Sequence, residues 1–154
     1  SGFGCELVRV GMSARDDELG HVHGVTELAE LLPTVHVVIV AVPLTDQTEG
    51  LIGDEFLAAL PDDAAVVNVS RGKVADGQAV LRAAGRIRYA SDVWDPEPLP
   101  SDHELWTAPG IFITPHIGGK SSAMRPRVER LVREQIAQLM GGGEPHHVVV
   151  RADA

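Results

Sequence analysis

Short apolar runs alternate with helical segments along most of this chain of 154 residues. Each run is rich in valine, isoleucine and leucine, and the segments between them carry apolar residues at helical spacing. Strands that are apolar along their whole length are typical of a parallel sheet covered on both faces. The alternation, at intervals of roughly 20 to 25 residues, therefore predicts an α/β fold with a doubly wound parallel sheet. The predicted strands span residues 7–10, 35–42, 64–69, 87–93 and 111–114.

The predicted helices have recognisable ends. Gly85 stops the third helix, and Gly141 begins a run of three glycines that stops the fourth. Ser121 or Ser122 is the predicted N-cap of the fourth helix, which then carries Pro126 in its first turn or two. The four helices are predicted over residues 25–32, 52–60, 76–84 and 121–140.

Charge and composition narrow the class of protein. The net charge of −9 argues against a protein that binds nucleic acids in general or that binds acidic membrane surfaces. The single cysteine, Cys5, excludes a disulfide within the chain. No apolar run approaches the roughly 20 residues that a membrane-spanning helix needs. The single cysteine and the lack of an apolar segment together predict a cytoplasmic protein. The net charge does not exclude a small anionic substrate, because a local arginine can dominate its own pocket.

Three residues with complementary chemistry follow three successive predicted strands. Arg71, Glu97 and His116 lie in loops that leave the carboxyl edge of the sheet, where α/β folds bind ligands. A guanidinium suits a carboxylate, an imidazole can give a proton to a carbonyl oxygen, and a glutamate can orient that imidazole. Taken singly, each could be an ordinary turn or loop residue. Taken together at one edge, they predict a catalytic constellation.

Four ordered motifs stand out: V-P-L-T at 42–45, N-V-S-R-G at 68–72, D-V-W-D-P-E-P at 92–98 and T-P-H-I-G-G at 114–119. With these motifs the sequence resembles the D-isomer-specific 2-hydroxyacid dehydrogenase family. Members of that family transfer a hydride between NAD(P)H and a 2-keto acid, so the resemblance implies an oxidoreductase with a Rossmann-like fold. A non-enzymatic dinucleotide-binding or regulatory module, or an inactive truncated dehydrogenase, is the alternative.

The resemblance also implies a role for each site residue. Arg71 binds the carboxylate and keto oxygen of a small 2-keto acid, His116 is the acid and base, and Glu97 is its partner. Asp92 holds the carboxamide of the nicotinamide. Relatives form dimers through this domain, which implies a homodimer. The implied cofactor contacts are Val42, Pro43, Asn68, Val69, Ser70, Asp92, Gly118 and Gly119.

The end of the first predicted strand favours NADP over NAD. In the family, an acidic residue at this point binds the adenosine ribose and repels a 2′-phosphate. Here Ser13 and Arg15 take that place, and both can bind a phosphate. The three carboxylates at 16–18 would oppose a phosphate if they turned toward it.

The sequence departs from the family at the glycine-rich turn. The G-x-G-x-x-G fingerprint is absent from the chain, and with it the strand that lies at the centre of the family's sheet. We therefore expect an interrupted sheet and a fragment with little catalysis of its own. Residues 1–119 are the expected partial dinucleotide-binding domain. Residues 120–154 are the expected crossover helix and tail.

The histidines outside the motifs predict no metal site. His21, His23 and His36 lack ligand spacing with a carboxylate or cysteine. His146 and His147 are adjacent near the end of the chain, and are either part of a solvated tail or an adventitious metal site.

Overall fold

A computed structural model describes residues 4–146 of the chain. The chain divides into two compact units, residues 1–115 and residues 116–154, and each is described by itself. The predicted tail beyond His146 lies outside the described residues.

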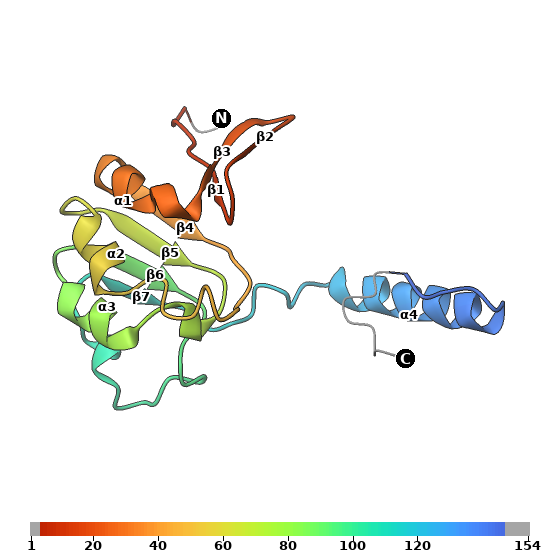
Figure 1. Ribbon diagram of the computed structural model, residues 1–154. Coiled ribbons are helices and arrows are strands. Elements are labelled where there is room, and N and C mark those ends of the chain that lie inside the picture. The colour runs from red at the N-terminus through yellow and green to blue at the C-terminus, as the bar shows by residue number, and fades with distance from the viewer. Residues whose placement is uncertain (1–3, 147–154) are drawn as a thin grey trace. The chain divides into compact units, whose positions relative to one another are not determined.

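Four parallel strands form the main sheet of the first unit (Figure 1). Neighbouring strands are in register, so that Val40 faces Asn68, Asn68 faces Ser91, and Ser91 faces Ile113. Their carboxyl ends therefore lie along one edge. The α/β fold and the parallel sheet predicted from the sequence are confirmed. In spatial order the strands are β4 (Val37–Val40), β5 (Ala65–Asn68), β6 (Arg88–Ser91) and β7 (Ile111–Ile113).

Two helices pack on one face of this sheet, α2 (Asp54–Ala59) and α3 (Gly77–Ala83) (Figure 1). The side chain of Asp76 caps α3 by accepting a 2.9 Å hydrogen bond from the backbone N–H of Gln78. Gly85 adopts a φ of 86° just after the helix, in agreement with its predicted role as a stop. The core between the helices and the sheet includes Ile52, Leu57, Val66, Val80 and Tyr89.

The other face of the main sheet is apolar but exposed within this unit. The register aligns Ile39, Val67, Ala90 and Phe112 in one row across the four strands. Ile39 is 68% exposed and Phe112 is 64% exposed. This row explains why the strands lack polar alternation in the sequence: side chains on both faces are apolar, although α2 and α3 cover only one.

A second, smaller sheet precedes the main one. β1 (Val10–Gly11) pairs in parallel with β3 (Gly20–Gly24), and β3 pairs antiparallel with β2 (Arg15–Asp17). β1 and β4 are edge strands of two separate sheets, as the expected interruption requires. The strand predicted over 7–10 overlaps β1 only at Val10, and the β2–β3 hairpin was not predicted.

Short helical turns connect these elements. η1 (Val25–Glu27), α1 (Leu28–Leu31) and η2 (Leu32–Thr34) follow β3 and confirm the predicted helical patch. Two further single turns are η3 (Gly72–Val74) after β5 and η4 (Glu104–Trp106) before β7.

The second unit contains one long helix, α4 (Met124–Met140). Its N-cap is Ala123, so the predicted cap at Ser121 or Ser122 is wrong; the carbonyl of Ser121 instead accepts a hydrogen bond from the N–H of Met124. Pro126 is the third residue of α4, where a missing N–H costs no helical hydrogen bond. No helix among residues 4–146 has the length and apolar character needed to cross a bilayer.

Candidate active site at the carboxyl edge of the main sheet

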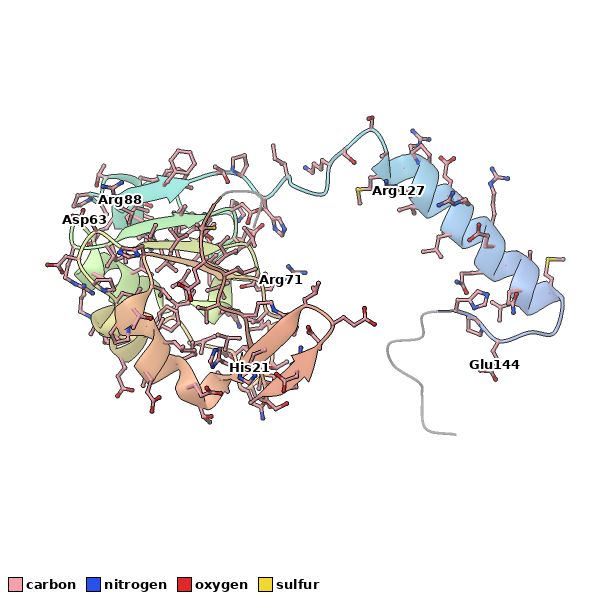
Figure 2. The ribbon with its side chains drawn as sticks, turned by 90° about the horizontal axis from the view of Figure 1, so that it is seen from above. His21, Asp63, Arg71, Arg88, Arg127 and Glu144 are labelled. Atoms are coloured by element: carbon pink, nitrogen blue, oxygen red, sulfur yellow. The ribbon has the colours of Figure 1, made fainter. Side chains whose placement is uncertain are left out.

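The loops that carry Arg71 and Glu97 leave the same edge of the sheet. Arg71 follows β5 by three residues, and Glu97 follows β6 by six. Arg71 lies at one end of the strands, whereas Arg88 and Asp63, 3.7 Å apart, lie at the opposite end (Figure 2). The parallel register thus brings two of the three predicted catalytic loops to one side of the unit.

Asn68 anchors the turn that presents Arg71. The amide side chain of Asn68 is fully buried at the end of β5. Its Oδ1 accepts a 3.0 Å hydrogen bond from the N–H of Ser70, and its Nδ2 donates at 3.2 Å to the carbonyl of Arg71. Nδ2 also donates at 3.2 Å to the hydroxyl of Tyr89, whose pKa is raised by burial. The side chain of Asn68 therefore shapes the loop, and the cofactor contact implied for Asn68 stays a prediction.

Asn68→Ala should lower the free energy of unfolding by about 2–4 kcal/mol, because it leaves several buried polar groups of the turn without partners. Tyr89→Phe removes one hydrogen bond of the same network and should cost about 0.5–1.5 kcal/mol. Urea unfolding of both variants checks the ranking. Equal losses in the two variants would contradict the anchoring role of Asn68.

The Arg71 turn touches the Glu97 loop through backbone. A Cβ added at Gly72 would lie 2.0 Å from the carbonyl oxygen of Trp94. The two backbone segments therefore approach so closely that only glycine fits at position 72. The hydroxyl of Ser91 donates to the carbonyl of Asn68 at 3.0 Å and to that of Val93 at 2.7 Å. The two loops therefore form one packed edge.

Asp92 carries an unusual carboxylate at this edge. It follows β6 directly, and its Oδ1 is a buried acceptor with no hydrogen-bond partner among residues 4–146. A buried polar atom left unpaired costs about 1–3 kcal/mol, and such atoms are rare in folded proteins. An acceptor in this state fits a ligand that brings an N–H, such as a carboxamide.

Arg15 lies over the carboxyl end of β1. A Cβ added at Gly11 would lie 2.7 Å from Nη1 of Arg15, and that nitrogen is 3.4 Å from the carbonyl of Ser13. Two of the three neighbouring carboxylates pair with other residues. Asp16 contacts the ring of His21 at 2.9 Å, and Asp17 forms a bidentate pair with Arg9 at 2.8 and 2.9 Å, which lowers the pKa of Asp17.

The remaining predicted site residues occupy two regions. Val42 and Pro43 follow β4, and the carbonyl of Pro43 accepts a 2.7 Å hydrogen bond from the hydroxyl of Thr48. Val69 extends the end of β5, donating its N–H to the carbonyl of Val40 at 3.0 Å. His116, Gly118 and Gly119 belong to the second unit. The meeting of His116 with Arg71 and Glu97 stays a prediction.

Comparison with known proteins finds a matching family model and similar proteins. Residues 1–118 match the model described as D-isomer specific 2-hydroxyacid dehydrogenase, NAD binding domain. The chain is 34% identical over 154 residues to a glyoxylate reductase of Korarchaeum cryptofilum, covering 96% of this chain and 46% of that protein.

Two solved structures are similar in fold and differ in cofactor. One is a D-isomer specific 2-hydroxyacid dehydrogenase from Xanthobacter autotrophicus Py2 in complex with NADPH and MES, with 32% identity and a TM-score of 0.73, over 94% of this chain and 59% of that one. The other is an NAD-dependent formate dehydrogenase from Staphylococcus aureus in complex with NAD, with 25% identity and a TM-score of 0.74, over 90% and 43%. The chain spans less than half the length of these curated relatives: 32% of a formate dehydrogenase of Arabidopsis thaliana and 46% of the glyoxylate reductase.

Proposed function

Because the chain belongs to the D-isomer specific 2-hydroxyacid dehydrogenase family through its NAD-binding domain, we propose that it serves an enzyme that reduces a small 2-keto acid with NAD(P)H. The chain supplies the cofactor-binding part and the groups that act on the keto oxygen. The packing of Gly72 against Trp94 carries this proposal, since it joins the loops of Arg71 and Glu97 at one edge beside the unpaired oxygen of Asp92.

Arg71 would bind the substrate. Its exposed guanidinium projects from a turn whose backbone is held by Asn68, and its Nη1 donates to the carbonyl of Ser70 at 2.6 Å. A planar fork of donors suits a carboxylate next to a carbonyl, because both oxygens lie in one plane. Binding there would fix the keto carbon and polarise its oxygen.

His116 would move the proton. When the keto carbon gains a hydride, its oxygen becomes an alkoxide and needs one proton to become a hydroxyl. A protonated imidazole at His116 would donate that proton and later regain one from solvent. Glu97 would hold the ring in the orientation that this transfer needs.

The cofactor would lie along the same edge. Bound NAD(P)H supplies the hydride. Asp92 would accept a hydrogen bond from the nicotinamide carboxamide, which would pair the buried Oδ1. The backbone around Pro43, Ser70 and Gly118 would line the rest of the site.

We propose NADP as the preferred cofactor. Arg15 lies beside Ser13 at the end of β1, where the family distinguishes the two cofactors. Two of the three carboxylates at 16–18 that would repel a 2′-phosphate pair with other residues, Asp16 with His21 and Asp17 with Arg9. The surroundings of Arg15 thus favour an additional phosphate.

Arg15→Ala should reduce kcat/KM for NADPH by about 10- to 150-fold in the full-length gene product, because a hydrogen bond to a charged group contributes about 1.5–3 kcal/mol. The value for NADH should stay within about twofold, because NADH has no 2′-phosphate to lose. Steady-state reduction of glyoxylate or hydroxypyruvate with each cofactor measures the ratio.

Arg88→Ala is the matched control, because it removes a guanidinium at the amino end of β6 (Figure 2). Its cofactor ratio should equal that of the wild type. An unchanged ratio in Arg15→Ala would refute the NADP preference alone. Absence of keto-acid reduction by the full-length wild type would refute the proposed function.

A further inference from the structure

Two histidines and a glutamate gather on one side of the small sheet. His21 and His23 are two residues apart on β3, so their side chains lie on the same face of the strand. Their rings are 4.6 Å apart and nearly perpendicular. Glu27 ends the turn η1 that follows the strand. The sequence analysis excluded a metal here for want of a carboxylate, but η1 brings Glu27 to 2.7 Å from Nδ1 of His23.

We propose that His21, His23 and Glu27 form a binding site for a divalent transition metal of the zinc class. Each residue offers one ligand atom, and the three atoms lie within 4.8 Å of one another. Two imidazoles and one carboxylate are a donor set that zinc uses with one position left open.

The hydrogen bonds around the cluster suit this role. Nδ1 of His21 contacts Asp16 at 2.9 Å, which favours the tautomer with its proton on Nδ1 and leaves Nε2 to bind a metal. Oε1 of Glu27 accepts a 2.6 Å hydrogen bond from the N–H of Gly24. This hydrogen bond holds the carboxylate beside the two imidazoles.

The side chains have room to close on an ion. Tetrahedral zinc bonds of about 2.0–2.1 Å place ligand atoms about 3.4 Å apart, so the three ligand atoms must close by up to about 1.4 Å. The side chains of His21 and His23 are 51% and 30% exposed, which permits small rotations. The site faces away from Arg15, because Arg15 lies opposite Val22 in the hairpin and successive strand residues alternate between faces. A bound ion would link the β2–β3 hairpin, on which Figure 2 labels His21, to η1.

Calorimetric titration with Zn²⁺ tests the site. His146 and His147 are replaced by alanine in every protein compared, since adjacent histidines can bind metal themselves. We expect one equivalent of Zn²⁺ to bind and to raise the melting temperature. Co²⁺ at the same site should give the intense visible absorption of tetrahedral coordination. Stoichiometric binding should be lost in His21→Ala and in His23→Ala.

Two conservative variants and one control complete the design. Glu27→Gln keeps an acceptor for the N–H of Gly24 but loses the charged ligand, and should bind at least about tenfold more weakly. Asp16→Asn should weaken binding by about 10- to 100-fold, the usual effect of disturbing a ligand's partner. His36→Ala should bind as the parent does. Absence of one-equivalent binding, or binding that survives both histidine variants, would overturn the proposal.

Discussion

Gly72→Ala is expected to destabilise the protein by about 3 kcal/mol, since the new methyl group has no room. Its Cβ would lie 2.0 Å from the carbonyl oxygen of Trp94, 2.1 Å from the carbonyl carbon and 2.6 Å from the nitrogen of Asp95. All three are backbone atoms, so relief requires the 92–98 loop to move as a whole. Urea unfolding with a shared m-value measures the loss.

Gly77→Ala is the matched control. Gly77 is the first residue of α3, and nothing lies within 4 Å of a Cβ placed there. Alanine at this position should be neutral or stabilising by up to about 1 kcal/mol. If Gly72→Ala unfolded at the same urea concentration as Gly77→Ala, the close approach of the two loops would be wrong.

The main sheet could be predicted because its strands are apolar on both faces, which gives apolar runs without polar alternation. Residues 35–42 are nearly all apolar, and β4 forms at the centre of that run. The ends could not be predicted, because apolar residues such as Val35 and Val42 also pack beside the core without pairing in the sheet. The N-cap of α4 was predicted wrongly, because a serine caps a helix only where the backbone of the preceding turn places its side chain near the first N–H groups.

The β2–β3 hairpin escaped prediction because its sequence is mostly polar. It is held by pairs that sequence spacing does not reveal, above all Arg9 with Asp17 across eight residues. Gly20 supplies a φ of 108° at its turn. The H-x-H motif with a glutamate four residues later was the one local signal of the His21, His23 and Glu27 cluster, and it has meaning only once a strand places both rings on one face.

At the site, strand order was enough to predict which loops share an edge. Arg71 and Glu97 follow neighbouring strands β5 and β6, as expected. The contacts that join their loops could not be predicted, because they involve the backbone of Trp94 and the backbone carbonyl of Asn68, which accepts from the hydroxyl of Ser91. Convergence of His116 with these loops depends on a second unit and stays a prediction.

His116→Gln should lower kcat/KM for keto-acid reduction by about 10²–10⁴-fold in the full-length gene product, the usual contribution of a positioned acid. Glutamine can still donate a hydrogen bond, but it has no proton to transfer near neutral pH. The dissociation constant of NADPH, measured by fluorescence titration, should change little, because the imidazole is assigned to the keto oxygen and not to the cofactor.

In the proposed mechanism, His116, oriented by Glu97, gives the proton to a keto acid held by Arg71. Its most direct test is kcat/KM for glyoxylate or hydroxypyruvate in the wild type, in His116→Gln and in the control His36→Gln, an exposed histidine just before β4. We predict the loss in His116→Gln alone, with NADPH binding retained. Wild-type reduction rates in the His116 variant would contradict the claim.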